Sequence, residues 1–160
     1  MAYHGVELQN SITIGKIFSI HYFEYMSNFS FAGESHNFWE FICVDKGEVG
    51  VTRGKSYTIL KKGDLIFHKP NEFHDVKATG GIAPNLVVIS FECNDDAMYF
   101  FNDRLLQIDE TERNLLANII IEARRCFDCR LDDPYLQNMP LKDPDTFGAQ
   151  QMIKLYLEHF

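Results

Sequence analysis

The chain carries two segments that combine apolar, carboxylate and imidazole side chains: Glu34-Ser35-His36-Asn37-Phe38-Trp39-Glu40-Phe41-Ile42-Cys43-Val44-Asp45-Lys46-Gly47 and Gly63-Asp64-Leu65-Ile66-Phe67-His68-Lys69-Pro70-Asn71-Glu72-Phe73-His74. Side chains alternate between the two faces of a β-strand, so residues 34, 36 and 40 would share one face. A histidine from the second segment can meet them there. We therefore predict that these four polar side chains converge inside an otherwise apolar space.

Short strands are predicted on both sides of these segments. Residues 86–91 form an apolar run typical of a buried strand. The intervening hairpins turn at Gly47, Gly54 and Gly63, where glycine can adopt the positive φ that such turns require. Short strands at this spacing favour an antiparallel sandwich or small barrel over alternating β-α units. We expect residues 1–93 to form this β domain.

The pattern changes after about residue 94, and we expect residues 94–160 to form a helical segment. Asp109 lies three residues before Glu112, which is the spacing of a capping box at a helix start. Residues 131–146 contain prolines and acids and are predicted to form a loop. A second helix is predicted to begin near Phe147.

Both predicted helices carry a wide apolar stripe. Such stripes most often pack in the core of their own domain, but two of them hold more apolar surface than one wall of a barrel covers. Pairing between two chains would bury the remainder. We therefore predict a homodimer with a contact formed by Leu115, Leu116, Ile119, Ile120, Met152, Ile153 and Tyr156. The second stripe reaches Phe160 without a stop signal, so we expect the natural chain to continue.

The composition limits the partners of the chain. Its 160 residues include 15 Lys+Arg and 23 Asp+Glu, for a net charge of -8, and 46% are hydrophobic. An acidic domain does not by itself attract nucleic acid or an anionic membrane. The chain shows neither a signal peptide nor an apolar run of membrane-spanning length, so we expect a cytoplasmic protein.

The spacing of Cys126 and Cys129 matches Cys-x-x-Cys. This spacing occurs in redox pairs and in halves of zinc knuckles, but here it lies at the end of an amphipathic helix and has no second pair. Two neighbouring free thiols are the favoured interpretation.

The two quoted segments resemble the two cupin motifs, of which the first runs His-x-His, then Glu and Gly, and the second runs from Gly through Pro to His. His36, Glu40 and His74 match ligand positions of these motifs, while Glu34 stands where the first His is expected. The resemblance implies a cupin-like antiparallel jelly-roll barrel. It also implies that His36, Glu40 and His74 could hold a divalent metal such as Zn, Mn, Fe or Ni. The departure at Glu34 favours a hydrogen-bonded pocket, so we expect no cofactor.

A wider likeness covers nearly the whole chain. It resembles the N-terminal sensor domain of AraC-type transcription regulators in the residues Leu60-Lys61-Lys62-Gly63-Asp64, Phe67-His68-Lys69-Pro70-Asn71-Glu72-Phe73-His74, Ala83-Pro84-Asn85-Leu86, Phe91-Glu92-Cys93 and Gly148-Ala149-Gln150-Gln151-Met152-Ile153-Lys154-Leu155-Tyr156-Leu157-Glu158. The resemblance implies a barrel that binds a small effector such as a sugar, followed by helices that dimerise. DNA binding would belong to helix-turn-helix motifs that follow this segment and are absent from this chain.

The predicted function is therefore effector sensing without catalysis. The residues expected to bind the effector are Glu34, His36, Phe38, Glu40 and His74. Trp39 has the opposite parity and is expected to pack in the core, and an N-terminal arm, residues 1–10, is expected to fold over a filled pocket. The alternative is a metal-dependent cupin enzyme, an isomerase, epimerase or dioxygenase, with its metal on His36, Glu40 and His74.

Overall fold

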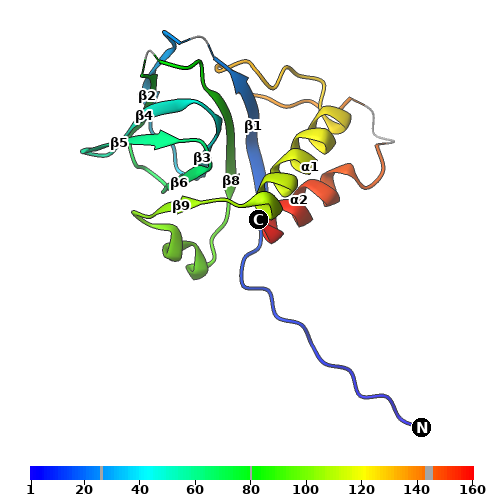
Figure 1. Cartoon of the computed structure of the whole chain (residues 1–160). Coiled ribbons are helices and arrows are strands. Elements are labelled where there is room, and N and C mark those ends of the chain that lie inside the picture. The colour runs from blue at the N-terminus through cyan, green and yellow to red at the C-terminus, as the bar shows by residue number, and fades with distance from the viewer. Residues whose placement is uncertain (26, 80, 143–145) are drawn as a thin grey trace.

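The computed structural model describes residues 1–25, 27–79, 81–142 and 146–160. Its elements, in chain order, are β1 (Lys16–Glu24), β2 (Ser30–Glu34), β3 (Trp39–Lys46), β4 (Glu48–Arg53), β5 (Ser56–Lys61), β6 (Asp64–His68), β7 (His74–Ala78), β8 (Asn85–Glu92), the 3-10 helix η1 (Asp96–Phe101), β9 (Leu105–Gln107), α1 (Glu110–Cys126) and α2 (Ala149–His159). Figure 1 shows the strands gathered on one side and the two long helices on the other.

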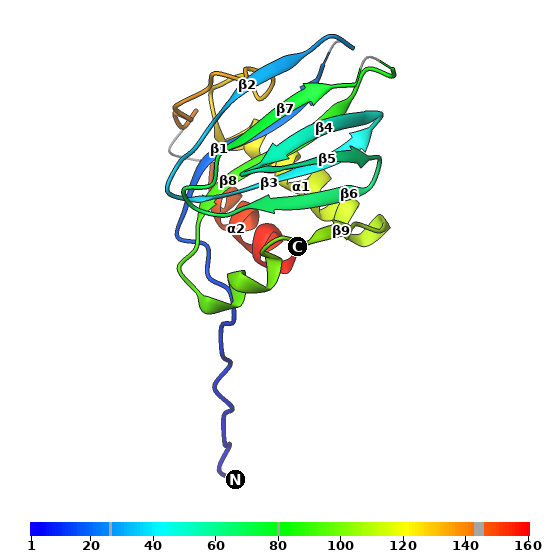
Figure 2. The same ribbon diagram turned by 90° about the vertical axis from the view of Figure 1, so that its left-hand side faces the viewer.

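The strands form two antiparallel sheets that pack face to face. The five-stranded sheet has the order β1-β8-β3-β6-β9, and the four-stranded sheet has the order β2-β7-β4-β5 (Figure 2). Apolar residues from both sheets form one core between them, including Ile42 and Leu86 from the first and Val51 and Leu60 from the second. The predicted fold class, mainly β in two antiparallel jelly-roll sheets with C-terminal helices, is confirmed, although the two sheets stay open and do not close into one barrel.

The side chains of β3 alternate between two cores. Ile42 lies in the core between the sheets, whereas Phe41 and Cys43 belong to a second core that includes buried residues of α1 and α2. Trp39 is 5% exposed and belongs to this second core, as its parity predicts. The five-stranded sheet therefore separates a helix-covered face from an inner face, and Glu40 has the parity of the inner face.

The helices begin where the sequence predicts. The Asp109 side chain accepts a hydrogen bond from the Thr111 backbone N–H (2.6 Å), and the Asp109 N–H donates to Glu112 Oε2 (2.8 Å), which completes the capping box. Neither helix in the described ranges combines the length and apolar character needed to cross a bilayer. The predicted loop before α2 is also present, but its positions 143–145 lie outside the described residues.

One strand lies in the part of the chain expected to be helical. Residues 105–107 form β9, which pairs antiparallel with β6 and extends the five-stranded sheet. Three residues are too few to show a period-two pattern, so the sequence carries no signal for this strand.

The helical stripe assigned to dimerisation requires a correction. Leu115, Leu116, Ile119, Ile120 and Ile153 are buried within the chain itself. Four of them belong to the core that α1 and α2 share with the five-stranded sheet, which already covers them: Leu116, Ile119, Ile120 and Ile153. Met152 and Tyr156 are partly exposed. The buried residues are therefore not available to a second chain.

All four cysteines are free thiols. Cys126 is fully buried and Cys129 is partly exposed. Burial raises the pKa of both thiols. A raised pKa disfavours the reactive thiolate.

Two isoleucines of α1 provide a direct test of this packing. Ile119 is fully buried, whereas Ile121 is 54% exposed. We expect Ile119→Ala to lower the free energy of unfolding by about 2–5 kcal/mol, because it leaves a cavity between helix and sheet. The control Ile121→Ala should cost less than about 1 kcal/mol. Urea unfolding of both variants measures the difference, and equal losses would contradict this packing.

Candidate ligand-binding site

Strand pairing brings polar side chains together at one end of the space between the sheets. Glu40 on β3 lies opposite His68 on β6 and opposite Ser90 on β8. In the other sheet, Glu34 at the end of β2 lies opposite His74 at the start of β7. Residues that are 50 positions apart in the chain thus become neighbours, as shown by the Ser90–Glu40 hydrogen bond.

His36 reaches the same place by a different route from the predicted one. The sequence argument puts residues 34, 36 and 40 on one continuous strand, but β2 ends at Glu34 and β3 begins at Trp39, in the other sheet. His36 lies in the connection between them. The predicted convergence still occurs, because ligand atoms of Glu34, His36, Glu40 and His74 all lie within 4.8 Å of one another.

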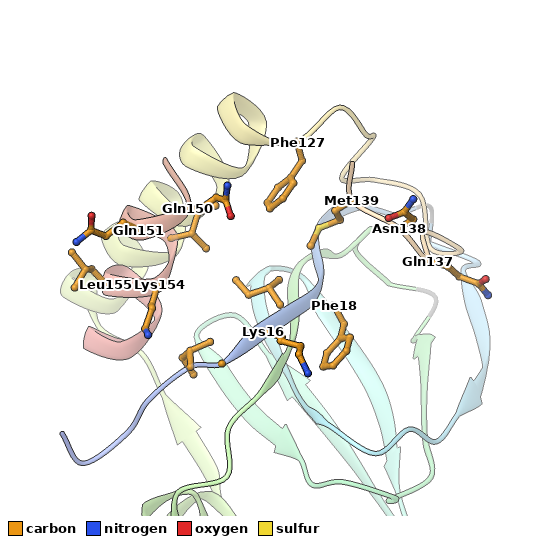
Figure 3. Close-up of a pocket in the computed structure, with 14 residues that line it drawn as sticks. Lys16, Phe18, Phe127, Gln137, Asn138, Met139, Gln150, Gln151, Lys154 and Leu155 are labelled. Carbon is orange, nitrogen blue, oxygen red and sulfur yellow. The ribbon is translucent and has the colours of Figure 1, made fainter. Parts of the chain in front are cut away.

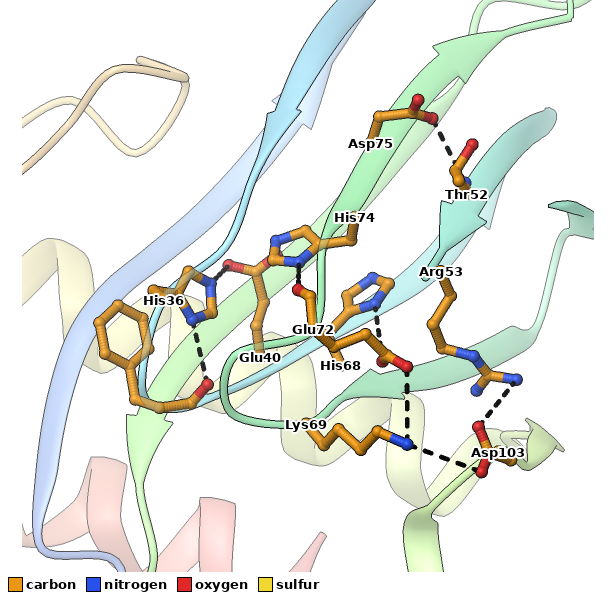
Figure 4. A network of polar contacts seen from close by, with 11 residues as sticks. His36, Glu40, Thr52, Arg53, His68, Lys69, Glu72, His74, Asp75 and Asp103 are labelled. Atoms are coloured by element: carbon orange, nitrogen blue, oxygen red, sulfur yellow. Dashed lines mark hydrogen bonds and ion pairs between the residues drawn. The ribbon is translucent and has the colours of Figure 1, made fainter. Parts of the chain in front are cut away.

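The Glu40 carboxylate is the hub of this cluster (Figure 4). His74 Nε2 lies 3.3 Å from its Oε1, and His36 Nε2 lies 3.6 Å from its Oε2. Ser90 Oγ donates a hydrogen bond of 2.7 Å to Oε2. Glu40 is only 7% exposed, so these contacts replace the water that the carboxylate loses on folding.

Both imidazoles are oriented by backbone carbonyls. His36 Nδ1 lies 3.0 Å from Phe38 O, and His74 Nδ1 lies 3.0 Å from Glu72 O. A carbonyl only accepts, so each Nδ1 carries a hydrogen, and each Nε2 is the ring nitrogen directed at the cluster. Metal-ligating histidines are commonly held in this way. The donor set of two imidazoles and two carboxylates therefore fits a divalent cation.

The charges of Glu40 and His74 support each other. Burial acts to raise the pKa of Glu40, but the neighbouring imidazoles of His36 and His74 and the hydrogen bond from Ser90 outweigh it and hold that pKa well below its usual range. Burial acts to lower the pKa of His74, but the contact with Glu40 raises it above the ordinary value. The ion pair is thus the favoured state of these two groups.

His68 is a member of the site that the sequence argument did not select. It is fully buried, and its ring stacks on that of His74 with centroids 4.2 Å apart. Neither ring nitrogen has a hydrogen-bond partner among the described residues. Burial, together with the neighbouring His74, lowers the pKa of His68 to about 3. His68 lies two residues after the apolar Ile66, so strand alternation places both on the same face. The sequence did not show which strand pairs with this one, and so did not place His68 beside His74.

A chain of ion pairs lies on the outer side of His68 (Figure 4). Glu72 Oε2 lies 4.0 Å from His68 Nδ1, and Lys69 Nζ lies 3.8 Å from both Glu72 and Asp103. Arg53 Nη2 lies 3.9 Å from Asp103 Oδ1. These long contacts contribute little stability individually. They cover the buried imidazoles with charged groups at this end of the site.

A small cavity of about 50 Å³ adjoins the cluster. Of the predicted residues, Glu34, Glu40 and His74 line it. Its apolar walls are formed by Phe23, Tyr25, Phe31, Ile42, Val76, Leu86 and Val88, with His21 and Pro134 completing the lining. The cavity joins aromatic surface to carboxylate and imidazole groups, which is the usual composition of a small-molecule site.

The expected role of Phe38 as a wall of this cavity is wrong. Phe38 does not line the cavity, because residues 35–38 form a connection and the alternation of a strand does not apply there. Its ring lies between His36 and Phe18, with centroid distances of 3.9 Å to each. Phe38 therefore orients His36 from behind.

A larger cavity of about 820 Å³ lies elsewhere, beside β1, α2 and residues 137–139 (Figure 3). Its charged lining residues are Lys16 and Lys154, and its polar ones include Gln150 and Gln151. It contains none of the imidazole or carboxylate groups of the cluster, so it is a separate surface.

Comparison with known proteins identifies the family. The profile described as "AraC-like ligand binding domain" matches residues 18–100. The chain belongs to this family. The match spans β1 to η1 and includes Glu34, His36, Glu40 and His74. A search of curated proteins found no match.

Among solved structures, the chain is similar to a cupin 2 conserved barrel domain protein from Rhodopseudomonas palustris, with 19% identity, a TM-score of 0.41, and coverage of 64% of this chain and 63% of that one. It is also similar to the Schizosaccharomyces pombe Cnp3 cupin domain, with 15% identity, a TM-score of 0.42, and coverage of 54% of this chain and 64% of that one. A third similar structure is the DMSP lyase DddQ from Ruegeria pomeroyi DSS-3, with 16% identity, a TM-score of 0.38, and coverage of 55% of this chain and 40% of that one. The chain thus spans less than two thirds of each of these proteins.

The buried His68 predicts a pH dependence of stability. Its pKa of about 3 lies below the ordinary value of 6.5, so the unfolded chain binds a proton that the folded chain excludes. Stability should therefore fall as the pH drops from 6.5 toward 3, by up to about 1.4 kcal/mol per pH unit from this group. In His68→Gln the slope between pH 6.5 and 5 should be smaller than in the parent.

The control is His4→Gln, which removes an imidazole from the exposed N-terminal segment. Urea unfolding at several pH values measures all three slopes. An unchanged slope in His68→Gln would show that His68 is protonated in the folded protein.

Proposed function

We propose that this domain senses a small effector for an AraC-type transcription regulator and binds it at the Glu40 cluster between the two sheets. The family match supports ligand sensing. The observation that carries the location is the buried Glu40 carboxylate, in contact with His36 and His74 and exposed to an aromatic-lined cavity. Ligand sensing rather than catalysis is the proposed role, and a sugar is the effector that the resemblance implies.

The chemistry of the cluster suits a ligand that donates hydrogen bonds. Glu34 and Glu40 only accept when ionised, so hydroxyl groups of a ligand would find partners there. Phe23, Phe31 and Tyr25 would contact its apolar faces. DNA contacts would belong to a part of the regulator outside this chain.

The cavity must open to admit such an effector. At about 50 Å³ it is far smaller than the roughly 300 Å³ or more of typical ligand sites. Pro134, from the connection between α1 and α2, lines it, and the nearby Leu131 carbonyl accepts a 2.9 Å hydrogen bond from the Tyr22 N–H. We propose that effector binding displaces this connection and so shifts the balance between two arrangements of the helices it joins.

A metal-dependent cupin enzyme is the second candidate, and the observation that supports it is the close approach of four possible ligand atoms. His36, Glu40 and His74 would hold the ion, with Glu34 as the fourth ligand. A bound divalent cation would supply Lewis-acid activation of a substrate oxygen. The carbonyls of Phe38 and Glu72 would keep both Nε2 atoms directed at it.

A ligand screen tests the first proposal. Among sugars and organic acids, a true effector at a hundred times its dissociation constant should stabilise the chain by about 2.7 kcal/mol in thermal unfolding. Glu40→Gln should reduce that shift at least fivefold, because it removes the accepting carboxylate. The control Glu24→Gln makes the same charge change at an exposed position of β1 and should retain the shift. A shift that survives Glu40→Gln would place the effector elsewhere.

Elemental analysis separates the two candidates. The protein is purified without chelator and without nickel resin, and bound Zn, Mn, Fe and Ni are measured. The sensor proposal predicts less than one ion per ten chains. A stoichiometric ion that is lost in His74→Ala but kept in His4→Ala would favour the enzyme.

A further inference from the structure

The N-terminal segment of the chain projects away from the rest of the protein. Residues 1–11 are all exposed, and they run straight away from the body (Figures 1 and 2). Within the described ranges, no hydrogen bond or ion pair joins them to other residues. Yet they carry large apolar side chains, with Tyr3 95%, Val6 87% and Leu8 87% exposed. Such a segment gains free energy by burying these side chains.

The groove beside β1 has the properties of a strand-binding surface. β1 is the edge strand of the five-stranded sheet, and among the described strands it pairs only with β8. The Leu131 carbonyl occupies its outer edge at Tyr22, whereas residues 14–18 line the 820 Å³ cavity (Figure 3). An open edge of this kind can pair with an added strand.

The side chains around the groove match those of the segment. Ile17, Phe127, Met139 and Leu155 provide apolar contacts. The charged lining residues are Lys16 and Lys154, whereas the charged side chain of residues 1–11 is that of Glu7. Lys16 already pairs with Glu92 of its own chain at 3.2 Å, and Lys154 with Glu158 at 3.7 Å. Attraction to Glu7 would therefore help to fix the register of the added segment and would contribute little to its affinity.

Residues 13–15, which form the root of the segment where it joins the body of the protein, direct it outward. Three consecutive backbone N–H groups are fixed: Thr13 donates to Asp95 (2.6 Å), Ile14 to Glu158 (2.9 Å) and Gly15 to the Glu92 carbonyl (2.9 Å). To enter its own groove, the segment would have to reverse direction within a few residues of this root. A second copy can receive it without reversal, because eleven extended residues reach about 36 Å.

We propose that residues 1–11 of one chain pair with the outer edge of β1 in a second copy, and that two chains exchange these segments reciprocally. Two identical contacts related by a twofold axis form a closed dimer. This contact uses none of the helix residues that are buried in the chain's own core. It does not depend on the effector site, so it stands or falls separately from the proposed function.

Sedimentation equilibrium of the full 160-residue chain tests the proposal. We expect a dimer at micromolar concentration, and the double variant Val6→Asp/Leu8→Asp should raise its dissociation constant at least tenfold. Leu155→Asp, in the wall of the groove, should do the same. The control Ile82→Asp changes an apolar side chain that is 64% exposed in a loop and should leave the dimer intact. A monomer at every concentration, or a dimer unaffected by the arm variants, would overturn the proposal.

Cross-linking identifies which chain fills the groove. In a Cys129→Ser background, one preparation carries Leu8→Cys and another carries Gln151→Cys, and the two are mixed with a short bismaleimide. Exchange predicts a covalent heterodimer. Cross-linking confined to a single chain that carries both substitutions would show that the segment folds back on its own β1, which overturns the exchange.

Discussion

The buried negative charge of Glu40 is the constraint around which this end of the protein is organised. A carboxylate that is 7% exposed is costly unless hydrogen-bond donors or positive charges replace its water. Here Ser90 comes from β8, His74 from β7 and His36 from the connection between the sheets. The two sheets are therefore tied together at this end by polar contacts, while apolar contacts join them over the rest of their area.

The five-stranded sheet serves two cores at once. Alternate residues of β3 enter the helix-covered core and the core between the sheets, so residues 39–44 of this strand are apolar except at Glu40. The helices use their apolar stripes to cover the outer face of this sheet. The buried residues of these stripes are taken up within the chain, and the edge of β1 and the exposed N-terminal segment are the surfaces proposed for association with a second chain.

The connection between α1 and α2 links the site to the helices. Asp128 N donates to the Pro140 carbonyl (2.7 Å) and Lys142 N to that of Cys126 (2.9 Å), which holds the two ends of the connection together. Its middle reaches β1 through Leu131 and the cavity through Pro134. A group that enters the cavity therefore meets a segment that is tied to the end of α1 through Cys126 and Asp128, which is why the proposed displacement of this connection would act on the helices.

The sequence by itself determined the local features: the strands, the capping box at Asp109, the opposite faces of Trp39 and Glu40, and the family. Each depends on neighbouring residues or on a short motif, so a one-dimensional pattern carries it. The tertiary structure alone decided that His68 stacks on His74, that β9 joins the sheet, and that Phe38 lies behind His36. These depend on which distant strands pair and where a strand ends, and the free energy that settles them comes from contacts between segments far apart in the chain.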